Sequence, residues 1–216
     1  MLKKYWYMIP IGGILLGFII FLICFYNIPR LSYRYMKEAD VYYVEKAYGN
    51  AKTYHIPETY KEKNVVGIDT RAFYQHSNLR TIQLPENIKV IGRLSFSECK
   101  KLESINLENV ETIYRNAFSY CSALQSIEIG ATDIGASAFF KCESLEAVTL
   151  LEGMKSIGSM AFSSTKIQSI SLPRSVESLG NDCFSSCFAL KNINVYGSNL
   201  KENSYLRSLS IVNYIG

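Results

Sequence analysis

The chain has 216 residues, of which 48% are hydrophobic and 19% charged, with a formal net charge of +4. This composition suits one folded domain with a short additional segment and excludes a chain that is disordered throughout. The positive charge lies in residues 1–64, which hold nine Lys or Arg and five Asp or Glu, whereas residues 65–195 hold twelve and thirteen. A nucleic-acid-binding domain carries basic charge on its folded body to neutralise phosphates, so we expect no nucleic-acid partner.

The first element along the chain is an uncharged apolar run of 22 residues from Tyr5 to Tyr26. A helix of this length, rising about 1.5 Å per residue, spans a hydrocarbon core of about 30 Å, and aromatic residues at both ends suit the membrane interfaces. No A-x-A cleavage pattern follows the run, and Ile23 precedes Cys24 where a lipoprotein signal needs a small residue. We therefore predict an uncleaved, single-pass transmembrane anchor over residues 1–30.

The flanking charges do not fix the orientation of this anchor. Two lysines precede the apolar run and three basic residues follow it within eleven positions, and the positive-inside rule does not separate such similar counts. Gly13 and Gly17 have the small-xxx-small spacing that lets two membrane helices approach closely, although glycine is common in membrane helices for other reasons. These two residues are a candidate face for a homodimer.

Residues 65–195 repeat with a period of 21–23 residues. Each unit has one phenylalanine, an Ile or Leu five residues before it, and an apolar L-x-x-I-x-L-type pattern after it. One such unit cannot bury its apolar positions alone, so neighbouring units must stack to share a continuous core. The phenylalanines are Phe73, Phe96, Phe118, Phe139, Phe162 and Phe184.

Each unit is predicted to contain one short strand and one short helical or 3-10 turn. In the first unit, period-2 alternation directs Ile82 and Leu84 inward and Gln83 outward. Residues 72, 73 and 76 would share one face of a helical turn. About six such units, with a cap at each end, form the predicted solenoid.

The repeat resembles a known class. Its pattern, V-x-x-I-G-x-x-A-F-x-x-C-x-x-L-x-x-I-x-L-P, is most complete in residues 88–107 and 154–173 and is similar to the BspA-like leucine-rich repeat, type 5. The resemblance implies a leucine-rich-repeat solenoid that follows a right-handed superhelix. It also implies an exported binding protein, since members of this class are mostly bacterial or protist surface proteins, several of them adhesins. The class has no fixed functional residue.

The two ends are expected to depart from the repeat, because the exposed ends of the core must be covered. Residues 31–64 are predicted to form a juxtamembrane segment and an N-terminal cap, in which residues 53–57 resemble the end of an incomplete unit. Residues 196–216 are predicted to form the C-terminal cap. Its apolar cover would come from Leu206, Leu209, Ile211 and Val212.

Cysteines recur three residues after the phenylalanine in four units. We expect a ladder of small buried thiols, because equivalent positions lie about 4.8 Å apart in a line and no C-x-x-C pair exists. A disulfide or metal site is the alternative. His55 and His76, the two histidines, lack metal-ligand spacing, and His76 occupies the ladder position. The ladder cysteines are Cys99, Cys121, Cys142 and Cys187.

The usual signatures of catalysis are not found in the sequence. There is no G-x-S-x-G elbow, no glycine-rich phosphate loop and no evident pair of carboxylates. We therefore predict a protein that is not an enzyme, with no catalytic, cofactor-binding or metal-binding residues.

The outward positions of the predicted strands form the candidate partner-binding face. Their short polar side chains suit hydrogen bonding but include no aromatic or arginine hot-spot residue, so a merely solvated sheet is the competing interpretation. The six candidates are Gln83, Asn106, Glu128, Thr149, Ser171 and Asn194.

Three functional hypotheses follow. The preferred one is a membrane-anchored, cell-surface module that displays an extracytoplasmic solenoid for protein binding or adhesion, without catalysis. The second is a membrane scaffold or signalling partner that uses both the transmembrane helix and the solenoid to associate with other membrane proteins. The third is a regulatory subunit of an enzyme.

Overall fold

The computed structural model describes residues 29–215. The predicted dimer face at Gly13 and Gly17, Cys24 and nearly all of the predicted anchor lie outside the described residues. Within residues 29–215, no helix has the length and apolar character needed to cross a membrane.

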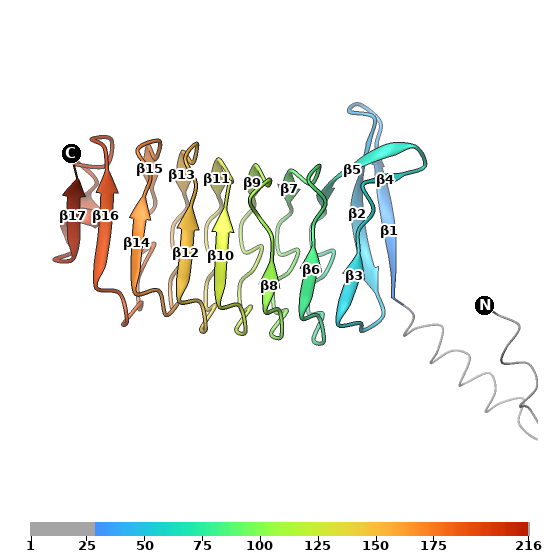
Figure 1. Cartoon of the computed structure of the whole chain (residues 1–216), viewed down its shortest axis with the longest axis horizontal. Helices are drawn as coiled ribbons and strands as arrows, with labels where there is room; N and C mark the ends of the chain where they lie inside the picture. The colour runs from blue at the N-terminus through green and yellow to red at the C-terminus, as the bar shows by residue number, and fades with distance from the viewer. Residues whose placement is uncertain (1–28, 216) are drawn as a thin grey trace, which may run out of the picture.

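The described chain is a stack of short strands that advances from β1 at one end to β17 at the other (Figure 1). The back sheet runs β1 (Arg30–Met36), β2 (Val41–Tyr48), β5 (Lys63–Ile68), β7 (Val90–Ile91), β9 (Thr112–Ile113), β11 (Asp133–Ile134), β13 (Ser156–Ile157) and β15 (Ser178–Leu179), with β4 (Thr59–Tyr60) paired to β5. The front strands are β3 (Thr53–His55), β6 (Thr81–Gln83), β8 (Ser104–Ile105), β10 (Ser126–Ile129), β12 (Ala147–Leu150), β14 (Ser169–Leu172), β16 (Asn192–Tyr196) and β17 (Val212–Ile215). One helix, α2 (Ser204–Arg207), precedes β17.

The front strands have the predicted alternation. In β6, Ile82 is buried between exposed Thr81 and Gln83, and parallel pairing places Ile82 beside Ile105 of β8. The same pairing joins Ile170 to Ile193 further along the stack. Identical apolar positions therefore form inward rows, which is the predicted arrangement for a leucine-rich-repeat solenoid.

The prediction of one strand per repeat was incomplete. A second strand lies on the back of each repeat and pairs in parallel with its neighbours; it has six residues in the first repeat (Lys63–Ile68) and two in each later one, such as Val90–Ile91. Two residues are too few to show a periodic pattern in the sequence. Their extended form depends on bonds from adjacent repeats, for example from the Tyr114 N–H to the Ile91 carbonyl at 2.9 Å.

The predicted helical or 3-10 turn was wrong, because this segment is a succession of hydrogen-bonded turns. Arg71 (φ 59°) and Gln75 (φ 60°) adopt the left-handed conformation, and equivalent positions do so in every repeat. A right-handed helix cannot pass through such residues. Alternate N–H groups instead bond to the next repeat, as the Phe73 N–H does to the Ser95 carbonyl at 2.7 Å. Ala72 and Phe73 still point inward, so burial was predicted correctly while the backbone was not.

The six repeat phenylalanines form a continuous stack through the core. Neighbouring rings lie between 4.9 Å (Phe73 and Phe96) and 6.0 Å (Phe162 and Phe184) apart and are nearly parallel. Five of the six side chains are completely buried, and Phe184 is 4% exposed. Stacked aromatic pairs add to the stabilisation from burial, so this column ties each repeat to the next.

Both ends continue the solenoid rather than only covering it. β3 pairs in parallel with β6, so residues 53–57 act as the front of an incomplete repeat. The antiparallel β1–β2 hairpin closes the N-terminal end, where Tyr33 and Tyr60 stack at 4.2 Å. At the other end, β17 extends the front in parallel from β16, and Leu206 is completely buried. Leu209, Ile211 and Val212 pack against the core.

Adjacent phenylalanines provide a matched test of the aromatic stack. Phe139 is completely buried between Phe118 and Phe162, whereas Phe140 is half-buried at the surface. We expect Phe139→Ala to lower the free energy of unfolding by about 3–5 kcal/mol, and Phe140→Ala by about 1 kcal/mol or less. Denaturant unfolding followed by circular dichroism measures both. Equal losses would contradict the role of the stack.

Candidate functional site

The outward side chains of the front strands lie in two parallel rows, which we call the front face. Register places Thr81 beside Ser104, Glu128 beside Thr149, and Ser171 beside Asn194. The first row is Thr53, Thr81, Ser104, Ser126, Ala147, Ser169 and Asn192. The second row is His55, Gln83, Asn106, Glu128, Thr149, Ser171, Asn194 and Asn213. All six candidate residues belong to the second row, so the structure brings them together as a line.

Four candidates, Gln83, Glu128, Thr149 and Ser171, are exposed on this face. Their neighbours in the first row are exposed as well, and all are small or unbranched polar side chains, apart from one alanine. A partner can therefore approach the sheet closely along its length.

Asn106 has a structural role that the sequence did not reveal. Its amide accepts from the Leu84 N–H at 2.7 Å and donates to the Leu84 carbonyl at 2.9 Å. These bonds replace the backbone pairing that a longer β8 would supply, because β8 ends at Ile105. Asn106 consequently holds two repeats together, and its amide is already occupied.

Asn194 also has intramolecular contacts. Asn213 of β17 approaches Asn194 Oδ1 at 3.4 Å and Asn192 Oδ1 at 3.5 Å through its Nδ2 group. These three amides join the last two front strands. The C-terminal end of the row is therefore more constrained than its centre at Glu128, Thr149 and Ser171.

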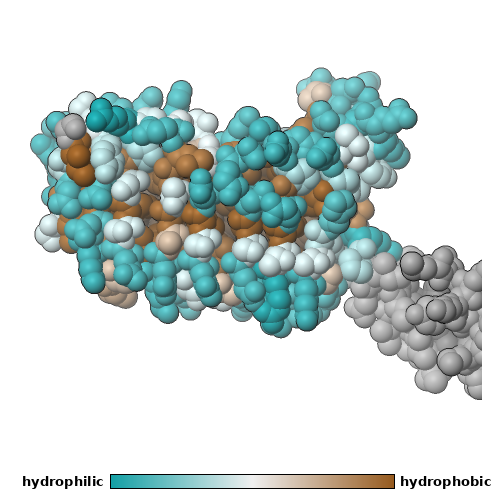
Figure 2. All heavy atoms as spheres, viewed as in Figure 1, coloured by the Kyte–Doolittle hydropathy of each residue, from teal (hydrophilic) through white to brown (hydrophobic). Residues whose placement is uncertain are grey.

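The front face carries little charge. Glu128 is the one carboxylate in its two rows, and His55 is the one other side chain there that can titrate. Short Ser and Thr side chains leave the inward row beneath them slightly accessible: Ile105 is 8% and Ile127 6% exposed. Figure 2 shows the resulting apolar band along this face between polar edges. Sequence alternation alone did not reveal this band, since it assigns such residues simply to the core.

A shallow hollow of about 460 Å³ lies at the N-terminal end of the front face. Gln83 lines it together with His55 and Glu58, over a floor that includes Pro57 and Pro85. The prolines end the front strands and hold the backbone away from the sheet. This hollow indents the N-terminal end of the row, where it brings together an imidazole, an amide and a carboxylate.

The predicted ladder of buried thiols is confirmed for its four members, which are buried and free, and Cys183, which lies outside the ladder position, is buried and free as well. Cys99 Sγ donates to the Phe73 carbonyl at 3.0 Å, and Cys121 and Cys142 repeat this bond one repeat further on. Burial raises the pKa of Cys99 and of Cys142 to about 12. Such thiols are protonated and unreactive at neutral pH.

His76 takes the cysteine position in the first repeat and is a partly buried residue with its ring hydrogen-bonded within the fold, as the sequence favoured. Its Nε2 lies 3.2 Å from the Ala47 carbonyl and its Nδ1 3.2 Å from the Tyr54 hydroxyl. Burial lowers the pKa of His76, which favours the neutral ring. Over residues 29–215, no three His, Cys, Asp or Glu side chains gather in a way that would hold a metal ion.

Stacked parallel strands, inward Leu, Ile and Phe rows and an exposed sheet together define a leucine-rich-repeat solenoid. The chain belongs to the family described as the BspA type leucine-rich repeat region, which matches it in six copies over residues 45–132 and 127–214. No curated protein matches the sequence.

Solved structures show the same fold. A leucine-rich cell surface protein from Faecalibacterium prausnitzii is 25% identical, with a TM-score of 0.58 over 76% of this chain and 52% of that one. A leucine-rich-repeat protein from T. pallidum is also 25% identical, with a TM-score of 0.53 over 76% of this chain and 68% of that one. The pneumococcal vaccine antigen PcpA is 22% identical, with a TM-score of 0.50 over 80% and 49%. The chain thus spans about half the length of the Faecalibacterium protein.

The two roles within the second row are separable by substitution. We expect Asn106→Ala to lower the free energy of unfolding by about 1–3 kcal/mol, because it leaves the Leu84 N–H and carbonyl without their partner. Thr149→Ala, on an exposed side chain, should change it by about 0.5 kcal/mol or less. Thermal and urea unfolding measure both variants. If Asn106→Ala left the free energy of unfolding unchanged, the amide of Asn106 would be available to a partner.

The thiol ladder predicts a loss of stability at alkaline pH. A thiol with a raised folded-state pKa stabilises the fold fully below its unfolded value near 9.0, and this contribution falls as pH rises toward about 12. In this range each such thiol lowers the free energy of unfolding by about 1.4 kcal/mol per pH unit. The stability difference between wild type and Cys142→Ala should therefore shrink between pH 9 and 10.5 in urea unfolding. A constant difference over that range would refute the prediction.

Proposed function

We propose that the chain is a membrane-anchored, cell-surface module that binds a protein partner through its front face and has no catalytic role. The observation that carries this proposal is the front face itself: two aligned rows of short, exposed and mostly uncharged side chains over an apolar band. At a strand spacing of about 4.8 Å, the six repeats span about 30 Å.

The chemistry of this face favours a particular kind of partner. With Glu128 as its one carboxylate, the face provides no electrostatic steering and no basic surface for phosphates. Short Ser and Thr side chains lose little conformational entropy when they are covered, and they permit close approach to the sheet. A complementary protein surface that brings its own aromatic or long side chains fits these properties, because the front face supplies none.

Anchoring is supported by the apolar run from Tyr5 to Tyr26, which has the length and flanks of a single-pass helix. β1 begins at Arg30, so little chain separates that run from the folded domain. Exposure at the cell surface is supported by family membership and by the Faecalibacterium relative, whose description names it a leucine-rich cell surface protein.

Topology can be tested with an introduced thiol. Asn199 is exposed in the loop after β16, and the five described cysteines are buried. Asn199→Cys in a Cys24→Ser background should react with an impermeant maleimide on intact cells as strongly as in lysed cells. The Cys24→Ser variant alone is the control. Labelling that appears only once the cells are lysed or their outer membrane is permeabilised would contradict cell-surface exposure.

Partner binding can be tested by site-specific photo-crosslinking from two matched serines. Ser171 of β14 and Ser178 of β15 are both exposed and belong to consecutive repeats, but they lie on the front and back of the solenoid. A photoreactive amino acid at 171 in the full-length chain should give a discrete crosslinked product on cells, whereas the same residue at 178 should give none. Crosslinking from 178 alone would place the interface elsewhere.

The same experiment separates the two alternatives. If crosslinks arise only in chains with an intact apolar run, and Gly13→Leu or Gly17→Leu abolishes them, a membrane scaffold or signalling partner that uses its helix is favoured. If the crosslinked protein is an enzyme that co-purifies at fixed stoichiometry, the chain is a regulatory subunit.

A further inference from the structure

A second surface adjoins the front face along the loops that lead into the front strands. We call it the lower rim: residues 49–53, 76–81, 99–104, 121–126, 142–147, 165–169 and 187–192, along the lower edge in Figure 1. β1 starts on the same edge, since Arg30 pairs with Tyr48 immediately before the first rim segment. The folded domain is therefore entered at one end of the lower rim.

Charge differs between the two long edges of the solenoid. The lower rim holds six Lys or Arg and three Glu, and its first three segments hold four and one. The opposite edge, residues 56–62, 84–89, 107–111, 129–132, 150–155, 172–177 and 195–201, holds five Lys or Arg and seven Glu. The molecule thus has a basic edge, which is most basic near the start of β1, and an acidic edge facing away from it.

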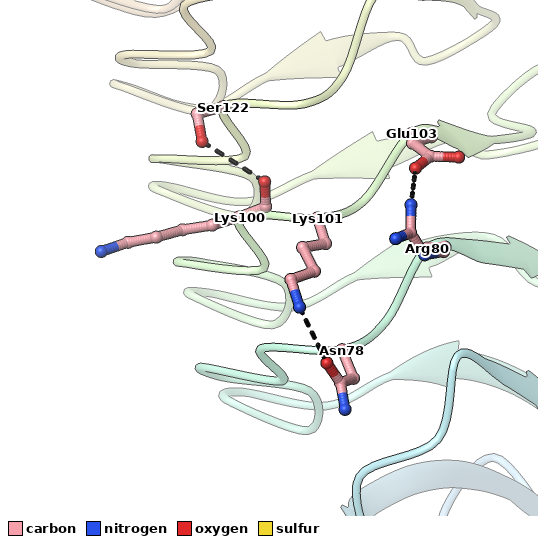
Figure 3. A network of polar contacts seen from close by, with 6 residues as sticks. All are labelled: Asn78, Arg80, Lys100, Lys101, Glu103 and Ser122. Carbon is pink, nitrogen blue, oxygen red and sulfur yellow. Dashed lines mark hydrogen bonds and ion pairs between the residues drawn. The ribbon is translucent and has the colours of Figure 1, made fainter.

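Of the rim cations in Figure 3, Arg80 is paired with a carboxylate, whereas Lys100 and Lys101 are not. Lys101 Nζ donates to Asn78 Oδ1 at 3.0 Å, and Ser122 Oγ bonds the Lys100 backbone carbonyl at 3.3 Å, while the Lys100 side chain extends away from the ribbon. Arg80 pairs with Glu103. Among the described residues, no ion pair joins Lys52, Lys100 or Lys101 to a carboxylate.

Aromatic side chains stand at both ends of the lower rim. At the start, the Tyr48 ring has Arg30 Cζ at 4.9 Å and Lys46 Nζ at 5.4 Å from its centroid. At the far end, Phe188 is 97% exposed at a position where Lys100 and Ser122 stand in earlier repeats. It lies beside a hollow of about 310 Å³ that Leu190 and Ile211 help to line. Basic and aromatic side chains on one edge are the combination that suits a lipid–water interface.

We propose that the lower rim is a membrane-docking surface, on which the solenoid lies lengthwise against an anionic phospholipid bilayer. This inference rests on the proposed anchor. Arg30 follows Tyr26 by four residues, which reach at most about 14 Å, so the start of the rim must stay close to the bilayer. Lysines near an anionic leaflet are attracted to it, and the acidic opposite edge is repelled. Phe188 would enter the interface about 30 Å along the rim.

An upright solenoid, with the β1–β2 hairpin facing the membrane, is the competing arrangement. At that end, Arg34 is paired with Asp69 at 2.6 Å and Lys63 with Asp40 at 2.5 Å. The other lysines there, Lys37, Lys46 and Lys61, are matched in number by Glu38, Glu45 and Glu62, so that end has no excess of positive charge among them. Paired charges attract an anionic surface less than the lysines of the rim do. The upright arrangement also leaves Phe188 in water, and so the two arrangements predict different environments at this residue.

Tryptophan quenching by lipid distinguishes them in the full-length chain. Trp6 is the one tryptophan, so Trp6→Phe gives a silent background. F188W places a probe on the lower rim, and S198W is its matched control at the same end but on the opposite edge, where Ser198 is exposed. Both are reconstituted in vesicles of phosphatidylcholine and phosphatidylglycerol brominated near the headgroup end of the acyl chains. Quenching of F188W should exceed that of S198W by at least about twofold.

Charge dependence provides the second readout. K100E with K101E in the F188W chain should bring quenching down to the S198W level, as should vesicles of phosphatidylcholine alone. Circular dichroism confirms that each variant is folded. Equal quenching of F188W and S198W, or quenching that ignores lipid charge, overturns the inference. Flotation of the chain with vesicles in high salt tests the anchor separately, since loss of flotation refutes the anchor and not the rim.

Discussion

The structure depends on the equivalence of neighbouring repeats, enforced by backbone hydrogen bonds between them. The Phe96 N–H bonds the Ala117 carbonyl at 2.8 Å, and the Phe118 N–H bonds the Ala138 carbonyl at 2.8 Å. Because the turns give every second N–H to the next repeat, a repeat without its neighbour would leave those donors unsatisfied. The phenylalanine stack can then form at ring spacings near 5 Å, since the backbone has already set the repeat distance.

That constraint explains which features were predictable from the sequence. Inward positions must be apolar in every copy, so Phe139 or Ile170 is recognisable by its register alone. The turn conformation was not recognisable, because Ala72, Phe73 and His76 point to one side both in a helix and in the observed turns. The decisive residues, Arg71 and Gln75, adopt positive φ without being glycine. Their conformation is imposed by contacts with the next repeat rather than by their own preference.

The roles of the candidate site residues were equally hard to predict from the sequence. Asn106 and Thr149 occupy the same position in their repeats, and the sequence gives no reason to separate them. Their roles differ because β8 stops at Ile105, whereas β12 continues to Leu150. Where the strand is short, an amide completes the ladder; where it is long, the side chain is left to solvent. Binding capacity along the row therefore depends on the length of each front strand, which is a property of the neighbouring repeats.

The outward positions, which differ from repeat to repeat, allow one scaffold to carry two adjoining surfaces. The front face is nearly uncharged and flat, whereas the lower rim is basic and bounded by Tyr48 and Phe188. A solenoid lying on its rim would hold the front face upright beside the bilayer, with all of its strands at a similar height. Every repeat would then be equally accessible to a partner along the membrane. An upright solenoid would instead place the hollow at Gln83 nearest the lipid and Ser171 far from it. The orientation of the rim thus decides whether the front face acts as one continuous surface or as a graded series of positions.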